Sequence, residues 1–148
     1  MVEREFIFLK PNTIRRGLTG EVISRLERRG IKIIALKMIQ FTREQAEKLY
    51  EEHKDKPFYN ELIDFVLSGP SVVMVVEGPR VIEMVRHIIG ATDPLKASPG
   101  SIRGEFGMSV TKNIVHASDS PEKAEREMKI FFSEEEILNY RLDVQGDL

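Results

Sequence analysis

The sequence contains no cysteine among its 148 residues. Disulfide cross-links, thiolate catalysis and cysteine-ligated metal sites are therefore excluded, and the composition suits a reducing cytoplasm, where we expect the protein. No apolar run approaches the roughly 20 residues that a membrane-spanning helix needs. The charged start Met1–Glu5 leads directly into an apolar stretch, without the pattern of a secretory signal. We expect one soluble domain that covers residues 1–148.

An excess of charge of one sign is also missing. Lysine and arginine number 22 against 24 aspartate and glutamate residues, which gives a formal net charge of −2. This balance argues against a nucleic-acid-binding surface along the whole chain, although local basic clusters are compatible with it. Charged residues nevertheless make up 31% of the chain, and together with the absent cysteine this is compatible with thermostability.

Several familiar catalytic patterns do not occur. There is no Gly-x4-Gly-Lys-[Ser/Thr] phosphate loop and no His-Glu-x-x-His zinc motif, and the glycines at 100, 104 and 107 do not form a dinucleotide-binding pattern. His53 and His87 lie in helix-like segments without the spacing of metal ligands, so we assign both to surface or structural roles. No metal site built from protein side chains alone is predicted.

The chain alternates strand-like and helix-like segments without a repeat or a linker. Apolar and β-branched runs predict strands at residues 5–9, 31–41, 71–77 and 113–117. Helical periodicity predicts helices at 19–29, from the capping box Thr42–Gln45, around 60–67, from Gly78-Pro79 to Ile89, and after Ser120-Pro121. The order indicates an α/β (α+β) protein with a ferredoxin-like βαββαβ core, a four-stranded antiparallel sheet and an inserted helical hairpin.

A long loop from Gly90 to Val110 precedes the last predicted strand. Loops of this length inside a compact domain usually have a function. Glycine punctuates the second half of this loop, which also carries Arg103. The loop is therefore expected to contribute to a site.

His116 is the strongest candidate for chemistry, because it ends a short apolar run just before a predicted helix start. A lone histidine among apolar neighbours more often has a structural role. However, Asn113, Ser118 and Glu127 accompany this one. A carboxylate that binds the far ring nitrogen would orient the imidazole and make it a better nucleophile. The sequence leaves open which nitrogen attacks.

Lys10, Arg86 and Arg103 are the cations that we expect to face phosphate groups. Any one of them alone would more often be a solvated surface charge, but arginine binds phosphate oxygens bidentately, and a transferring phosphoryl group spreads its charge over three oxygens. Lys10 shares a strand face with Phe6 and Phe8, where a buried ammonium needs a partner. Together with a histidine nucleophile, these cations indicate phosphoryl transfer.

The stretch Asn113-Ile-Val-His-Ala-Ser-Asp119 resembles the active-site signature of the nucleoside diphosphate kinases, Asn-x-x-His-[Gly/Ala]-Ser-Asp. Five further stretches occur in the family's order and spacing, at residues 8–11, 50–58, 68–70, 90–94 and 99–104. The resemblance extends from about Glu5 to Phe132. It implies the fold described above and a kinase that transfers the γ-phosphoryl group of a nucleoside triphosphate such as ATP to a nucleoside diphosphate. A ping-pong mechanism through phosphohistidine, with broad base specificity, is implied as well.

The resemblance also implies a role for each matching residue. The implied catalytic residues are His116, Glu127, Ser118, Lys10 and Tyr50. The implied nucleotide-binding residues are Lys10, Phe58, Leu62, Arg86, Thr92, Arg103, Val110 and Asn113. Within this set the cations and Thr92 face the phosphates, Asn113 and Lys10 the ribose, and the Tyr50 hydroxyl the transferred group. Phe58, Leu62 and Val110 hold the base, although each taken alone would be read as core packing.

Mg²⁺ is implied as the metal, carried by the nucleotide phosphates and not by protein ligands. The family also commonly assembles as trimers of dimers, with residues 94–104 near the threefold contacts. We expect a hexamer, with a tetramer as the alternative, because residues 133–148 are short and acidic and lack the tail of many animal members. Ala117 stands where many members have glycine. The competing class is a regulatory nucleotide- or nucleic-acid-binding module that has lost turnover, but such a module would not need an intact His116.

Overall fold

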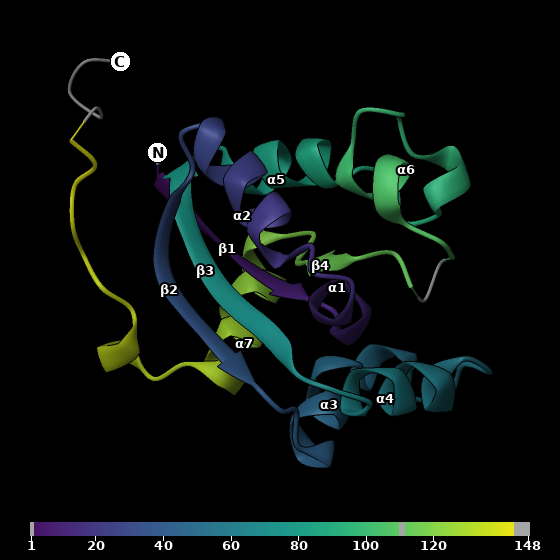
Figure 1. The fold of residues 1–148 in the computed structure, drawn as a ribbon. Helices are drawn as coiled ribbons and strands as arrows, with labels where there is room; N and C mark the ends of the chain where they lie inside the picture. The colour runs from purple at the N-terminus through teal and green to yellow at the C-terminus, as the bar shows by residue number, and fades with distance from the viewer. Residues whose placement is uncertain (1, 110–111, 144–148) are drawn as a thin grey trace.

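The structure is a computed structural model that describes residues 2–109 and 112–143 (Figure 1). Its strands are β1 (Val2–Leu9), β2 (Lys32–Ile39), β3 (Ser71–Pro79) and β4 (Val115–Ala117). They form one sheet in the order β2-β3-β1-β4, and every neighbouring pair is antiparallel. The predicted four-stranded antiparallel sheet is confirmed.

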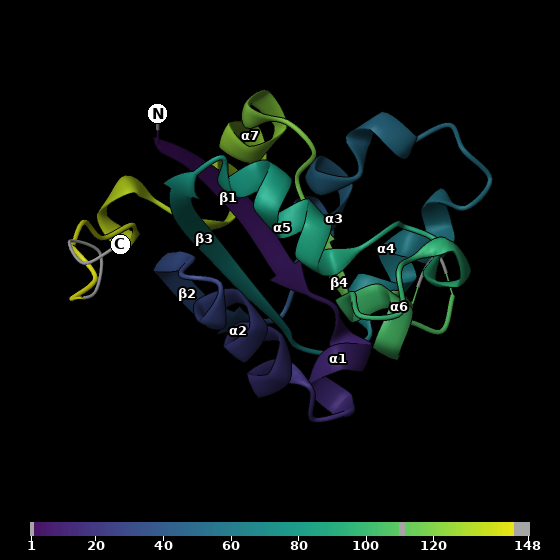
Figure 2. The ribbon, with the colours of Figure 1, turned by 90° about the horizontal axis from the view of Figure 1, so that it is seen from above.

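Helices cover both faces of the sheet (Figures 1 and 2). The α-helices are α1 (Pro11–Arg15), α2 (Thr19–Arg28), α3 (Arg43–Leu49), α4 (Tyr59–Leu67), α5 (Val81–Ile89), α6 (Ile102–Phe106) and α7 (Pro121–Phe131). Single 3-10 turns are η1 (Glu51–His53), η2 (Pro94–Lys96) and η3 (Glu134–Glu136). Figure 1 shows α3 and α4 together below the sheet, where they form the predicted helical hairpin.

Alternation along the central strands divides the core into two clusters, because successive strand side chains point to opposite faces. Phe6 and Phe8 face a cluster that α3, α4 and α7 complete. Ile7 and Leu9 face a second cluster that α2 and α5 complete. No helix within the described residues is long and apolar enough to cross a membrane.

Two helix starts follow the local sequence signals closely. Thr42 and Gln45 form the predicted capping box, with the Gln45 amide 3.1 Å from Thr42 Oγ1 and the Thr42 amide 3.0 Å from Gln45 Oε1. The Ser120 hydroxyl accepts from the Lys123 amide at the start of α7, and Pro121 occupies its first turn. These two caps set where the hairpin and the last helix begin.

Several predicted boundaries were wrong. Gly78 and Pro79 do not open a helix: they pair with β1, which begins three residues earlier than predicted, and α5 starts only after Arg80. The predicted second strand is shorter at both ends, because only residues 32–39 pair. The predicted last strand is limited to Val115–Ala117. The loop at 90–110 is not continuous, because it contains η2 and α6, and α1 was not predicted at all.

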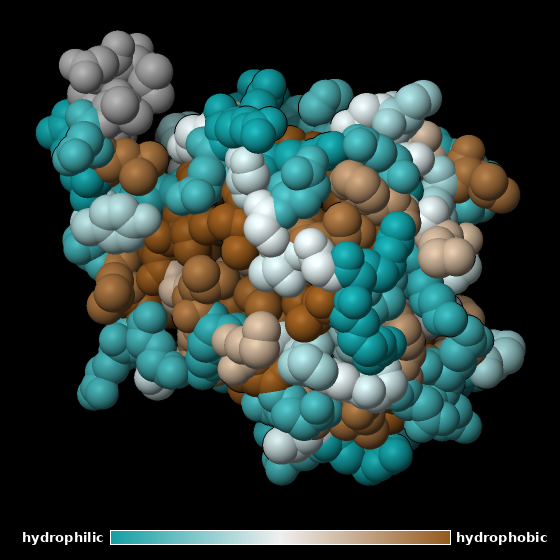
Figure 3. Space-filling model, viewed as in Figure 1, coloured by the Kyte–Doolittle hydropathy of each residue, from teal (hydrophilic) through white to brown (hydrophobic). Residues whose placement is uncertain are grey.

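Apolar side chains also gather on the surface around β2, the outer strand of the sheet (Figure 3). Leu36 and Met38 are 50% and 61% exposed. The segment after η3 runs beside the start of this strand, where the Leu138 amide donates to the Ile34 carbonyl at 2.9 Å. The exposed part of β2 is therefore an apolar patch on the surface of the described chain.

Candidate active site

A cavity of about 570 Å³ opens where the end of β1, the α3–α4 hairpin, α5 and β4 meet. Figure 2 shows the hairpin and the α6 segment on the same side of the molecule as β4. Nine of the predicted site residues line the cavity: Lys10, Tyr50, Phe58, Leu62, Arg86, Thr92, Arg103, Asn113 and His116. Ser118 and Glu127 lie behind His116, and Val110 lies outside the described residues.

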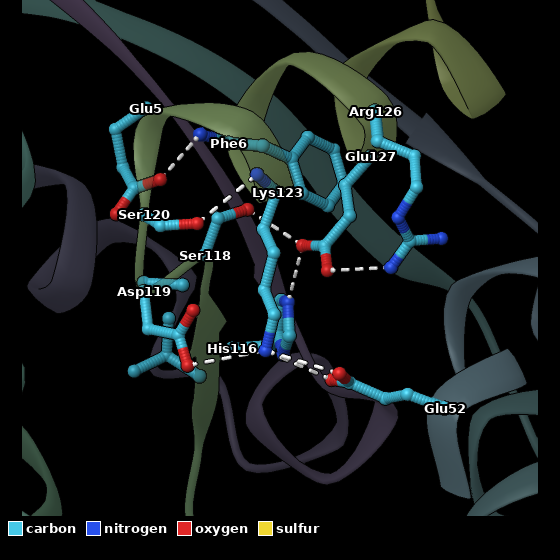
Figure 4. A network of polar contacts seen from close by, with 12 residues as sticks. Glu5, Phe6, Glu52, His116, Ser118, Asp119, Ser120, Lys123, Arg126 and Glu127 are labelled. Atoms are coloured by element: carbon cyan, nitrogen blue, oxygen red, sulfur yellow. Dashed lines mark hydrogen bonds and ion pairs between the residues drawn. The ribbon is translucent and has the colours of Figure 1, made fainter.

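His116 is held by a buried carboxylate (Figure 4). Its Nε2 atom lies 2.8 Å from Glu127 Oε1, and the Ser118 hydroxyl donates to the same oxygen at 2.6 Å. Arg126 Nη2 lies 3.5 Å from the other oxygen, Oε2. Because Glu127 engages Nε2, the ring nitrogen that points away from the carboxylate is Nδ1.

The charge state of Glu127 follows from these partners. Burial alone would raise the pKa of this carboxyl, but the hydrogen bonds from His116 and Ser118, together with the charge of Arg126, lower the pKa below its usual value. Glu127 is therefore an anion at neutral pH. An anion in this position favours a hydrogen on Nε2 and stabilises positive charge that develops on the ring.

The backbone before β4 places the His116 ring over the core. Ile114 has a φ of 85°, in a region that β-branched residues rarely adopt. Its carbonyl accepts from the Lys10 amide at 3.0 Å and from the Thr13 hydroxyl at 2.5 Å. The ring of His116 then stacks on Phe8, with ring centroids 5.2 Å apart. Buried contacts on several sides thus hold this strained stretch and orient the ring.

Two buried cations face His116 across the cavity. Lys10 and Arg103 are 6% and 4% exposed. Burial, with a smaller contribution from Arg103, lowers the pKa of Lys10 to about 7. Burial, followed by the charge of Arg86, lowers the pKa of Arg103 to about 10. Positive groups that are destabilised by desolvation and by one another favour an anionic ligand between them.

Backbone carbonyls fix the direction of both arginines. Arg103 donates to the Gly90 carbonyl at 3.0 Å and to the Val115 carbonyl at 2.7 Å, and Arg86 donates to the Ala117 carbonyl at 3.2 Å. Arg103 Nε is buried and has no hydrogen-bond partner among the described residues. The guanidinium groups are thus positioned before any ligand binds, which is the preorganisation that charge stabilisation requires.

Two glycines let the 90–104 segment fold tightly around Arg103. Gly90 has a φ of 92°, and a Cβ there would lie 2.3 Å from Ser101 Oγ. A Cβ at Gly104 would lie 2.1 Å from the Ser98 carbonyl oxygen. Asn113 then donates from Nδ2 to the Thr92 carbonyl at 2.9 Å and joins this segment to the last strand. The glycine punctuation of the predicted loop therefore has a steric cause.

The hairpin forms the opposite wall. Phe58, at the start of α4, is 42% exposed, so the side chain is not part of the packed core. Leu62 lies one turn later on the same helix. Tyr50 is buried, and burial together with the negative charge of Glu127 raises the pKa of its hydroxyl. An exposed aromatic ring beside a pocket is a suitable surface for a nucleotide base.

Six further residues line the cavity but were not predicted as site residues: Glu52, His53, Lys56, Ala117, Asp119 and Lys123. His53 was assigned to a surface or structural role, but its ring lies 5.5 Å from that of Phe58 at the cavity wall. Asp119 ends the signature, and three of the others lie within the 50–58 stretch, so position in a motif was the available signal. Lys123 carried no such signal.

A larger groove of about 850 Å³ lies between α2, α5 and the segment that contains α6. Its lining includes Arg25, Arg28 and Lys96 but not His116 or Lys10. Arg25 is already paired there with Glu21 and Glu105. Size alone therefore does not identify the site, whereas the polar groups that converge around His116 do.

Comparisons with known proteins agree with this geometry. The family model described as nucleoside diphosphate kinase matches residues 3–137. A nucleoside diphosphate kinase from Thermosipho melanesiensis is 69% identical over 147 residues, which is 99% of this chain and 100% of the relative. One from Archaeoglobus fulgidus is 55% identical over 139 residues, covering 94% of this chain and 92% of the relative.

Solved structures give the same result. The nucleoside diphosphate kinase of Halobacterium salinarum in complex with CDP superposes with a TM-score of 0.95 at 38% identity, over 99% of this chain and 97% of that one. The enzyme of Aquifex aeolicus gives a TM-score of 0.90 at 45% identity, over 93% and 100%. The fold, the signature around His116 and these relatives lead to one conclusion: the chain belongs to the nucleoside diphosphate kinase family.

Proposed function

We propose that His116 is the residue that carries the phosphoryl group in the transfer from a nucleoside triphosphate to a nucleoside diphosphate. Nδ1 attacks the γ-phosphorus, an N–P bond forms, and the bond from phosphorus to the bridging oxygen breaks and releases the diphosphate. A second diphosphate then takes the group back from Nδ1 by the reverse steps. The observation that supports this most is the 2.8 Å contact between His116 Nε2 and Glu127, which leaves Nδ1 as the nucleophile.

Glu127 stabilises the positive charge that the ring acquires as the N–P bond forms. Ser118 donates to the same carboxylate oxygen and thereby holds it in place. Lys10 and Arg103 bind the transferring group, whose negative charge is spread over three oxygens. Both side chains are more than nine-tenths buried, and in such a dry site each charge interaction is stronger than it would be in water.

The remaining polar residues orient the nucleotide. Arg86 and Thr92 bind the inner phosphates, Asn113 and Lys10 the ribose hydroxyls, and the Tyr50 hydroxyl approaches the transferred group. Because these groups meet at one cavity, the nucleotide loses its translational and rotational entropy when it binds. That entropy cost is therefore not added to the barrier of the chemical step. The Halobacterium salinarum relative is described as a complex with CDP, which supports a nucleotide in this cavity.

Phe58 and Leu62 hold the base, with Val110 proposed from the sequence as a third contact. A flat aromatic face offers few hydrogen-bonding groups to the edge of a base. Strong discrimination would need buried polar groups that the wrong base leaves unpaired. Purine and pyrimidine nucleotides are therefore accepted with similar efficiency.

Mg²⁺ enters with the nucleotide and neutralises charge on the phosphates. The cavity fits a metal that is carried in this way. Its two carboxylates, Glu52 and Asp119, are already paired with Lys123, and no group of three or more histidine and acidic side chains among the described residues could hold an ion. The protein binds the phosphates that carry the ion.

The chain functions as a homo-oligomer, and a hexamer is the proposed form. The exposed Leu36 and Met38 lie in the apolar patch around β2 (Figure 3), and contiguous apolar patches often mark surfaces that contact another chain. The tetramer remains the alternative. The cytoplasmic location expected from the absent cysteine stays a prediction.

His116→Ala tests the proposal. The substitution removes the attacking nitrogen but leaves Lys10, Arg103 and Phe58 in place. Nucleotide binding should survive within a fewfold in calorimetric titration with ADP, whereas phosphoryl transfer should fall by several orders of magnitude. Transfer at the wild-type rate in this variant would exclude His116 as the nucleophile and would move the search to another residue.

A further inference from the structure

One lysine joins the two sides of the cavity mouth (Figure 4). Lys123 Nζ lies 3.1 Å from Glu52 Oε2 in η1 and 3.4 Å from Asp119 Oδ2 in the turn before α7. Glu52 belongs to the hairpin that carries Phe58, whereas Asp119 follows the strand that carries His116. The contact therefore connects the wall proposed to hold the base with the wall proposed to hold the nucleophile.

A second cation of α7 reaches the same hairpin. Arg126 Nη1 donates to the Lys48 carbonyl near the end of α3 at 3.1 Å, while Nη2 lies 3.5 Å from Glu127 Oε2. Lys123 and Arg126 are three residues apart, so they lie on one side of the helix. That side of α7 is therefore in contact both with the hairpin and with the carboxylate that holds His116.

Lys123 contacts Glu52 just before a stretch of the hairpin that has little other support. Residues 54–58, which connect η1 to α4, are all exposed and carry no regular helix. Segments with so little burial open locally at low free-energy cost. Phe58 lies at the end of this stretch, so its distance from His116 depends on how the hairpin is held.

We propose that Lys123 is a positioning residue, which holds the hairpin at the separation from β4 that a nucleotide requires. The inference rests on the proposed function, because it assumes that Phe58 contacts the base and that His116 attacks. An isolated surface ion pair contributes little, but one ammonium between two carboxylates forms a small network. The hydrogen bond to Glu52 also raises the pKa of Lys123, so the charge is kept throughout the working pH range.

A positioning role of this kind affects binding more than chemistry. The base-contacting wall interacts equally with the bound substrate and with the transition state, so loosening it raises KM and leaves kcat nearly unchanged. Lys123→Met should therefore raise the KM for a nucleoside diphosphate about threefold to tenfold, with kcat within about twofold of wild type. Lys123→Arg, which keeps the charge, should restore most of the loss.

Lys129→Met is the matched control. Lys129 lies on the same helix, is exposed, and pairs only with Glu125 of that helix among the described residues. Its loss removes one positive charge without touching the hairpin, so KM should stay at the wild-type value. An equal rise of KM in both variants would overturn the proposal in favour of a general effect of charge.

A double-mutant cycle and hydrogen exchange complete the test. If the contact with Glu52 is the cause, Glu52→Gln should raise KM as Lys123→Met does, and the double variant should be no worse than either. Amides of residues 51–58 should exchange faster in Lys123→Met than in wild type. In Lys129→Met they should exchange at the wild-type rate. A wild-type KM and wild-type exchange in Lys123→Met would overturn the positioning role. Such a result would leave the phosphohistidine untouched, since labelling of His116 tests that separately.

Discussion

Two carboxylates are buried near the same end of the sheet, and they behave in opposite ways. Glu127 is 2% exposed and its pKa is lowered, whereas Glu5 is fully buried and its pKa is raised to about 9. Glu127 accepts from His116 and Ser118 and pairs with Arg126. Glu5 accepts only the amide of Phe6, and its Oε2 atom has no partner among the described residues.

Hydrogen-bond and charge partners, and not depth of burial, therefore decide whether a buried carboxyl is charged. Burial raises the pKa of both groups, by disfavouring the charged form. Only around Glu127 do donors outweigh that effect, so only Glu127 is an anion that can stabilise a charged imidazole. Glu5 is a neutral acid at pH 7, and the proposed mechanism gives it no step.

The largest effect should come from removing the charge of Glu127. Glu127→Gln keeps the shape and an oxygen that can accept from Nε2, but it no longer stabilises the developing positive charge. We expect kcat to fall about 10- to 100-fold, with KM near the wild-type value, in steady-state assays with ATP and a diphosphate acceptor. A wild-type kcat would mean that the carboxylate only supports the structure.

The corresponding change at Glu5 should affect stability and not turnover. A native pKa of about 9 against about 4.5 in the unfolded chain means that the native state binds more protons between these values. The contribution of Glu5 to the free energy of unfolding is therefore largest below pH 4.5, and it is lost as pH rises toward 9.

The glutamine side chain of Glu5→Gln cannot ionise, so this variant should not lose stability in this way as pH rises. Between pH 6 and pH 8, the free energy of unfolding of the variant should gain about 2 to 3 kcal/mol relative to wild type, because nearly the full slope of about 1.4 kcal/mol per pH unit applies over two units. Urea unfolding at the two pH values measures the difference. Parallel pH dependence in both proteins would show that Glu5 is already ionised in the native state and would remove the contrast with Glu127.

The smallest of these effects should come from Ser118→Ala. The substitution removes one donor to Glu127 Oε1 and leaves the His116 contact in place. A single buried hydrogen bond is worth about 1 kcal/mol, so kcat should fall about threefold to tenfold. A loss as large as that of Glu127→Gln would indicate that the hydroxyl itself takes part in the chemistry.

Much of the fold could be predicted, because the signals involved are local. Apolar periodicity located the strands and long helices, and the capping residues at Thr42 and Ser120 set where two helices begin. His116 lies in the last strand, and Glu127 lies about two turns into the helix that follows after a short turn. This arrangement allows the helix to fold back and place Glu127 beside His116. Short elements such as α1 and α6 were missed, because five residues give too little periodicity to recognise.

The remaining features depend on contacts that are distant in sequence. The positive φ of Ile114 is maintained by Lys10 and Thr13, a hundred or so residues earlier. The pairing of Lys123 with Glu52 joins a helix to a hairpin 71 residues away. No local pattern predicts either contact. The opposite charge states of Glu5 and Glu127 also require knowledge of which donors surround each group.

Phosphohistidine formation is tested by incubating the purified protein with γ-³²P-labelled ATP and Mg²⁺ and analysing the labelled protein without acceptor. We expect close to one label per chain that is lost in acid, retained in alkali and returned to nucleotide when a diphosphate is added. Mapping should place it on His116, and the His116→Ala variant should take up none. A label that survives acid, or that maps to a serine such as Ser118, would exclude His116 as the phosphorylated residue.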